Sequence, residues 1–314
     1  MECATVMLSL VLLLGPLKKI TSIAIAPCDF PAVYNFGDSN SDTGGISAAF
    51  EPIQAPYGKS FFRGRFSDGR LLIDFIAELM RLPYLSAYLD SIGSNFRHGA
   101  NFATGGSTIR RQTRLYSKVK NKLPRPREFS KSLYTIDIGQ TDSAVGFRQM
   151  SNIQLRTAIP DIIYQFSAAV TVVLDNYGCL KSHNKMALEF NRQLKARIRT
   201  LRAELGHAAI TYADVYAAKY ELISNAKSQD FMEPQKICCG LHERNTHVWC
   251  GQKGIVRGAE VFGGACVNPS DYISWDGIHY SQAANQWIAD HILNGSFSDP
   301  PIPITHACHK HLHY

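Results

Sequence analysis

Short apolar runs that end in turn residues recur along this chain. Four of them predict strands, at residues 32–36, 98–103, 133–138 and 208–212. Strands that are apolar throughout are typical of a parallel sheet buried on both faces. A β-branched run at 170–174 fits either a further strand or the end of a helix that begins near residue 160.

Between these runs, apolar residues recur every three or four positions, which is the period of a helix with one buried face. This pattern predicts a helix at 72–79, with Ser67 or Asp68 as its cap. It predicts another at 284–292, capped by Ser281.

The longest predicted helix spans residues 184–205. Strands that alternate with helices predict an α/β fold with a parallel sheet and helices on both faces, because each parallel connection needs a crossover. Residues 237–271, rich in Gly and Cys, are interpreted as a loop rather than a second domain. A length of 314 residues suits a single domain with long loops.

The N-terminus carries an apolar run at 6–17 followed by small residues, which predicts a cleaved signal peptide over residues 1–26. A buried N-terminal helix is the alternative. The rest divides into one domain, 27–304, and a tail, 305–314. The signal peptide predicts a protein secreted to the extracellular space or cell wall. No apolar run has the length of a transmembrane segment, which disfavours a membrane-spanning protein.

Of the eight cysteines, seven follow Cys3, and an exported chain favours disulfides. An odd number leaves at least one thiol free or paired between molecules. A zinc site is the rival interpretation for one cluster, formed by Cys238, Cys239, Cys250 and His242 or His247. Adjacent cysteines lack the usual ligand spacing, so disulfides are favoured there. For the histidines of the tail, a loosely ordered segment is favoured over a metal site.

The net charge of +7 is spread along the chain, with a basic concentration at 110–127. No stacking aromatics or recognition helix accompany it, so a nucleic-acid partner is not expected. A solvated loop is the favoured interpretation, and attraction to an acidic cell-wall polysaccharide is the functional alternative. Asn294 begins a glycosylation sequon.

The segment FGDSNSDTGG at 36–45 places Ser39 between a predicted strand and a Gly-rich turn. A serine hydroxyl needs an imidazole to take its proton and a group that orients that imidazole. Asp276 and His279, three positions apart, can supply both, as in a catalytic triad. Helix-capping roles for Ser39 and Asp276, with His279 exposed, are the structural alternative.

Gly105 and Gly106 follow the second predicted strand. A backbone N–H of either glycine, together with the N–H of Ser39, can stabilise a developing oxyanion. The alternative is a tight turn with no chemical role. No G-x-S-x-G elbow occurs, which argues against the larger α/β-hydrolase fold.

The sequence resembles the secreted plant GDSL esterase/lipases of the SGNH hydrolase superfamily, and in particular the early-nodulin and fucosidase-like branch. The matching blocks are FGDSNSDTGG at 36–45, SDGRLLIDFIAE at 67–78, NFATGGST at 101–108, TIDIGQTD at 135–142 and YISWDGIHYSQAAN at 272–285. The resemblance implies a three-layer α/β/α sandwich with a flavodoxin-like parallel sheet. It also implies that Ser39 is the nucleophile and that Asp276 and His279 complete the triad.

Two departures from this family pattern affect the expected activity. Relatives carry an asparagine that donates into the oxyanion hole where this chain has Thr141. Relatives also carry additional sequence between the second and third blocks, and a strand and turn before residue 178. The sheet therefore lacks an inner strand unless 170–174 supplies it. We expect slow turnover, because loss of one oxyanion donor costs roughly a hundred- to a thousandfold in rate.

The sequence thus predicts a secreted serine esterase that cleaves carboxylic esters through an acyl-enzyme. The substrate is expected to be an acylated sugar, a small metabolite or a lipid, and the chemistry requires neither a metal nor an organic cofactor. A secreted pseudoenzyme that binds a glycan or lipid without turnover is the alternative. A cell-wall structural protein is disfavoured, since repeats and Pro-rich tracts are missing.

Overall fold

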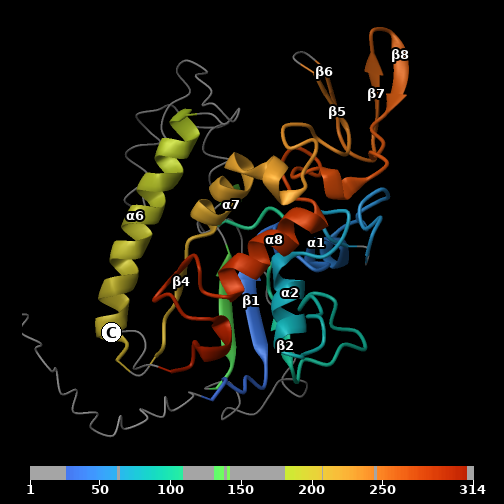
Figure 1. Ribbon diagram of the computed structural model, residues 1–314. Helices are drawn as coiled ribbons and strands as arrows, with labels where there is room; N and C mark the ends of the chain where they lie inside the picture. Colours follow the sequence, from blue (N-terminus) through green and yellow to red (C-terminus); the bar gives the residue numbers. More distant parts are fainter. Residues whose placement is uncertain are drawn as a thin grey trace, which may run out of the picture.

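A computed structural model of the protein describes residues 26–61, 64–108, 131–137, 140–141, 181–206, 208–243 and 246–309. Its centre is a parallel sheet of three strands in the order β2–β1–β3 (Figure 1). The strands are β1 (Val33–Gly37), β2 (Gly99–Asn101) and β3 (Leu133–Asp137). Three of the four predicted strands are therefore confirmed, as is the α/β class with a parallel sheet.

Two helices, α2 (Leu72–Leu79) and α8 (Gln282–Leu293), pack on one face of this sheet. Their apolar sides meet Val33 of β1, and Leu133 of β3 adds to the same cluster. The predicted helical periodicity at both places is confirmed. The buried residues of this cluster are Val33, Leu71, Ile73, Phe75, Ile76, Leu85, Ala289 and Leu293.

The opposite face of the sheet carries aromatic side chains. Tyr34 stacks on Tyr134 with ring centroids 5.4 Å apart, and Phe36 stacks on Phe102 at 5.0 Å. The side chain of Ile136 on the same face is 73% exposed. Helices on both faces were predicted, but the described elements form a packed helical layer only on the Val33 face.

The start of α2 differs from the prediction. Neither Ser67 nor Asp68 caps it; instead the Asp74 carboxylate accepts the N–H of Leu71 at 2.8 Å. The Ser67 hydroxyl donates to the carbonyl of Tyr280, while Asp68 accepts the N–H of Gln282 at 2.7 Å. The two residues predicted to cap α2 therefore bind the segment before α2 to the start of α8, although these segments lie far apart in the sequence. Ser281 caps α8 as predicted, accepting the N–H of Ala284.

The fourth predicted strand, at 208–212, is corrected by the structure. Only β4 (Tyr212–Ala213) forms there, and it pairs antiparallel with β9 (Ser298–Asp299). A further strand would join the central sheet by pairing with one of its strands, and among the described strands β3 pairs only with β1. The possible strand at 170–174 lies outside the described residues, as do the basic segment 110–127 and the signal sequence up to residue 25.

Three further α-helices are described. They are the short α1 (Gly45–Ala49), the long α6 (Lys181–Glu204) and α7 (Val215–Ser224). The prediction of a long helix at 184–205 is confirmed. α6 is joined to β9 by ion pairs of Lys195 and Arg202 with Asp299, and it stands to one side of the sheet in Figure 1.

Residues 237–271 contain more regular structure than the predicted loop. β5 (Leu241–Glu243) pairs with β6 (Thr246–Val248), and β7 (Lys253–Val256) pairs with β8 (Ala259–Phe262). Disulfides Cys238–Cys266 and Cys239–Cys250 hold the bases of the two hairpins together. The described residues also form three short 3-10 helices, η1 (Ala226–Gln229), η2 (Pro269–Asp271) and η3 (Ile304–His306).

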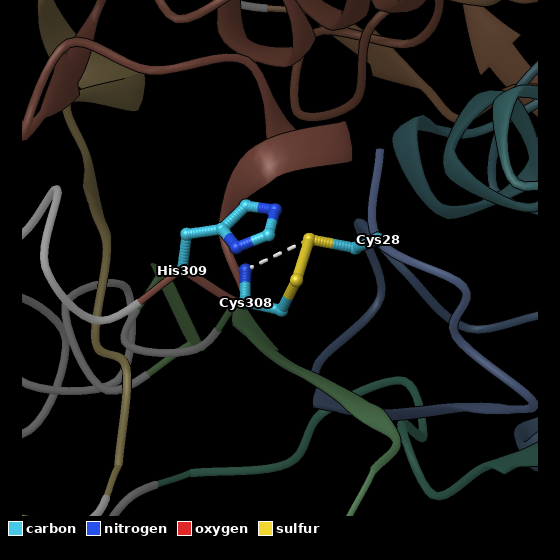
Figure 2. Close-up of side chains that lie close together, drawn as sticks. All are labelled: Cys28, Cys308 and His309. Atoms are coloured by element: carbon cyan, nitrogen blue, oxygen red, sulfur yellow. Dashed lines mark hydrogen bonds between the residues drawn. A yellow bond between two sulfur atoms is a disulfide. The ribbon is translucent and has the colours of Figure 1, made fainter. Parts of the chain in front are cut away.

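A third disulfide, Cys28–Cys308, joins residues 280 positions apart (Figure 2). The chain next to β1 is thereby attached to the segment after η3, and the N–H of Cys28 also donates to the carbonyl of Thr305. Residues 305–309 of the predicted tail are thus fastened to the domain. The three disulfides use six of the seven cysteines after Cys3, and the seventh, Cys179, lies outside the described residues.

Candidate active site

Ser39 lies in the turn that directly follows β1, at the carboxyl end of the parallel sheet. The turn needs Gly37, because a Cβ there would be 2.4 Å from the carbonyl oxygen of Asp137 on the neighbouring strand. The buried Asp38 carboxylate closes the turn by accepting the N–H groups of Asn40 at 3.1 Å and of Thr141 at 3.3 Å. Ser39 is therefore presented on a rigid turn where parallel sheets usually carry their ligands.

His279 approaches this serine from the other end of the chain. Its Nε2 is 2.8 Å from Ser39 Oγ, and its Nδ1 is 2.7 Å from Asp276 Oδ2. Asp276 is nearly inaccessible to solvent and His279 is only 8% exposed. The structure thus brings together the three residues that the sequence suggested as a nucleophile, a base and an orienting carboxylate.

The Asp276 carboxylate also organises its own turn. Oδ1 accepts the N–H of Ile278 at 2.9 Å and the N–H of His279 at 2.8 Å. Burial acts to raise the pKa of Asp276, but the hydrogen bonds and charge of His279, with the N–H of Ile278, lower it below its ordinary value of 3.8 overall. Asp276 is therefore ionised at neutral pH and can stabilise a positive charge on the imidazole.

The two candidate oxyanion glycines differ in their environment. The N–H of Gly105 donates to Asp42 at 2.7 Å, so this group is already used inside the protein. Gly106 has a positive φ of 81°, and a Cβ built on it would meet no atom within 4 Å, so its surroundings are open. Of the two, Gly106 is the better placed to offer its N–H to a substrate.

Thr141 is held next to the Ser39 turn by the hydrogen bond of its N–H to Asp38. The adjacent Gln140 joins the two halves of the site. Its side-chain oxygen accepts from Asn40 at 2.7 Å, and its amide donates to the carbonyl of Ile278 at 3.3 Å. The third block therefore lies between the serine turn and the histidine turn, although Asp142 is outside the described residues.

Sequence reasoning gave no role to Asp42, which links the first and second blocks. This carboxylate is fully buried and accepts four backbone N–H groups, those of Gly44, Gly45, Ile46 and Gly105. In the sequence, only its place in the block FGDSNSDTGG pointed to a role for Asp42, because its partner Gly105 is 63 positions away.

Two aromatic residues at the site were also missed. Tyr57 donates its hydroxyl to Asp276 Oδ2 at 2.8 Å, and Phe66 stacks on the His279 ring with centroids 4.9 Å apart. Burial, followed by the charge and hydrogen bond of Asp276, raises the pKa of Tyr57, so the phenol remains a donor. Trp275 is completely buried behind this group, with its ring edge-on to Tyr57.

The cysteines weighed as zinc ligands do not fit a metal, because Cys238, Cys239 and Cys250 all form disulfides. Within the described ranges one other group, Cys28, Cys308 and His309, brings candidate ligand atoms together (Figure 2). Its two sulfurs are bonded to each other, and His309 Nε2 contacts the carbonyl of Ala26 at 2.7 Å. Metals bind cysteine as the thiolate, so this oxidised group does not fit a metal site.

Residues 33–292 match the model of a protein family described as GDSL-like Lipase/Acylhydrolase. The chain belongs to this family. A GDSL esterase/lipase of Arabidopsis thaliana is 50% identical over 95% of both chains. The ENOD8 GDSL esterase/lipase of Medicago truncatula is 39% identical, covering 90% of this chain and 91% of its own. Alpha-L-fucosidase 3 of Arabidopsis thaliana is 40% identical, covering 85% and 91%. The predicted family is thus confirmed, and with it the assignment to the GDSL-type carboxylic ester hydrolases.

This GDSL chain is shorter than its alignment with the first Arabidopsis relative. The alignment spans 369 positions, whereas this chain has 314 residues. At least 55 aligned positions, the difference between these two numbers, are therefore occupied only in the relative. Additional sequence in relatives was expected from the motif spacing. Among the described helices of the GDSL chain, none has both the length and the apolar character needed to cross a membrane.

Proposed function

We propose that this protein hydrolyses carboxylic esters with Ser39 as nucleophile, His279 as general acid and base, and Asp276 as the residue that orients the imidazole. The single observation that carries the proposal is the 2.8 Å contact between Ser39 Oγ and His279 Nε2. A hydroxyl at this distance can give its proton to the imidazole as it attacks a carbonyl carbon.

In the first half-reaction, Ser39 Oγ bonds to the carbonyl carbon while its proton passes to His279 Nε2. The carbonyl oxygen becomes an oxyanion, which the backbone N–H groups of Gly106 and Ser39 stabilise. Collapse of this intermediate breaks the bond to the alcohol oxygen, which takes the proton back from His279. The products are an alcohol and an acyl-Ser39 ester.

In the second half-reaction, water attacks the acyl carbon and gives a proton to His279. The tetrahedral intermediate then expels Ser39 Oγ, which recovers that proton, and a carboxylic acid leaves. Asp276 remains ionised throughout, as its lowered pKa favours, and balances the imidazolium charge in both halves. Apart from the ester and water, these steps use the protein's own side chains and backbone N–H groups.

Turnover is proposed to be slow, because Thr141 stands where the family's oxyanion asparagine is expected. A threonine hydroxyl offers one donor on a shorter arm than an asparagine amide. The same substitution, together with the positions occupied only in relatives, favours a second candidate function. In that case the site around Ser39 binds a glycan or lipid without cleaving it.

We also propose the fold, the location, a glycosylation site and the substrate classes of this esterase. The β2–β1–β3 order is that of the first strands of a flavodoxin-like sheet, which supports a three-layer α/β/α sandwich. Three disulfides support export to the extracellular space or cell wall. Asn294 is exposed just after α8, where a glycan can be attached. The proposed substrates are acylated sugars, including those of acidic wall polysaccharides, small acylated metabolites or lipids.

A fluorophosphonate probe, which reacts with activated serines, tests the proposal. We expect labelling of the wild type, no labelling of Ser39→Ala and full labelling of Ser94→Ala, whose hydroxyl donates to the carbonyl of Asp90 in a surface loop. Hydrolysis of p-nitrophenyl acetate should follow the same order. A folded wild type, judged by a cooperative thermal melt, that is neither labelled nor active would favour the binding function instead.

A further inference from the structure

Tyr57 contacts the carboxylate that orients the imidazole. Its hydroxyl donates to Asp276 Oδ2 at 2.8 Å, and His279 Nδ1 is bonded to the same oxygen at 2.7 Å. The other oxygen accepts two backbone N–H groups. A carboxylate offers about four acceptor positions, so every one on Asp276 has a donor, and only the Tyr57 donor comes from outside the Asp276–His279 turn.

The ring of Tyr57 is fixed by other aromatic side chains. It lies edge-on to Phe66 at 5.9 Å and to Trp275 at 6.1 Å between centroids. Phe66 in turn lies nearly parallel to the imidazole, with 20° between the ring planes. The hydroxyl therefore has a defined position, because rotation of the ring would break these contacts.

Phe66 also connects this group to the candidate oxyanion turn. A Cβ placed on Gly105 would lie 2.8 Å from Phe66 Cε2, so the ring packs directly on the backbone there. The loop between α1 and α2 thus contacts the carboxylate, the imidazole and the glycine turn. These contacts fix the imidazole relative to the place where a substrate carbonyl would bind.

We infer that Tyr57 is a positioning residue for ester hydrolysis, whose hydroxyl locks the Asp276 carboxylate so that His279 keeps Nε2 directed at Ser39. The inference rests on the proposed function and adds a residue to it. The hydroxyl also draws negative charge from the oxygen that stabilises the imidazolium. Tyr57 therefore acts on both the geometry and the proton affinity of the base.

Tyr57→Phe removes the hydroxyl and keeps the ring. We expect kcat for p-nitrophenyl acetate to fall about tenfold, since a hydrogen bond to an ionised group has on the order of this effect, while KM stays the same. The acid limb of the kcat/KM profile should move to higher pH, because Asp276 Oδ2 regains the charge that the hydroxyl had drawn.

The matched control is Tyr84→Phe. Tyr84 also donates its hydroxyl to a carboxylate, that of the exposed Glu78, but it lies outside the site. We expect kcat and the pH profile of this variant to equal those of the wild type. Thermal melts of both variants will show whether the Tyr57 variant is folded at the assay temperature.

A double-mutant cycle separates positioning from general support of the fold. In an Asp276→Asn background, Tyr57→Phe should lower kcat by less than twofold, because its effect passes through the ionised carboxylate. A fluorogenic ester makes the low residual rate measurable. The same tenfold loss in both backgrounds would contradict the inference, as would an unchanged kcat and acid limb in a folded Tyr57→Phe protein. A folded but inactive and unlabelled wild type would overturn the proposed function as well.

Discussion

Replacement of Asp42 by Asn should damage both the stability and the activity of this protein. Each carboxylate oxygen accepts two backbone N–H groups: Oδ1 those of Gly44 and Gly45, and Oδ2 those of Ile46 and Gly105. An asparagine of the same shape has only one oxygen. Whichever way its amide is turned, an NH2 group faces two backbone donors in a site that solvent does not reach.

The magnitude follows from those two donors. A buried donor left without a partner costs about 1–3 kcal/mol, so the substitution should lower the free energy of unfolding by about 2–6 kcal/mol. That is a large fraction of the roughly 5–15 kcal/mol by which a domain is usually stable. Esterase activity should also fall in the folded fraction, because the Gly105 N–H loses its anchor and the neighbouring Gly106 turn can move.

Urea denaturation followed by tryptophan fluorescence measures the free energy of unfolding. Hydrolysis of p-nitrophenyl acetate, at a temperature well below the melting range, measures the esterase activity. Asp90→Asn is the control, since Asp90 is exposed and its side chain lies outside the described hydrogen-bond network of the site. We expect it to match the wild type in both assays. An Asp42→Asn protein with wild-type stability, within about 0.5 kcal/mol, would refute the reasoning.

Two other predictions concern the site itself. Thr141→Asn should raise kcat by about a hundredfold at unchanged KM if it restores an oxyanion donor, measured with p-nitrophenyl acetate; no gain would show that this donor is not the missing element. The lowered pKa of Asp276 makes stability depend on pH: its contribution is complete above the unfolded value near 3.8 and is lost as pH falls through the lower folded value. Asp276→Asn should therefore be less stable than the wild type in urea at pH 7, and the gap should narrow by pH 3, whereas a constant gap would contradict this.

Much of this protein was predictable from local patterns. The strands β1, β2 and β3 and the helices α2, α6 and α8 follow from apolar runs and helical periodicity, which depend only on nearby residues. Ser39, Asp276 and His279 became candidates for a triad because of their residue types and their positions in motifs that follow predicted strands or precede predicted helices. Ser281 was recognised as a cap because capping is decided within one helical turn.

Other features depended on contacts between distant segments, which the sequence does not specify. Asp68 was expected to cap α2 but instead binds the start of α8, 214 positions later. The hydrogen bonds of Asp42 to Gly105 and of Tyr57 to Asp276 became apparent only from the folded chain. The choice between Gly105 and Gly106 likewise depended on which N–H already had a partner. Residue types and their spacing thus determined which groups were available for catalysis, whereas tertiary packing decided which of them have free hydrogen-bonding capacity, because that capacity is a property of neighbours in space.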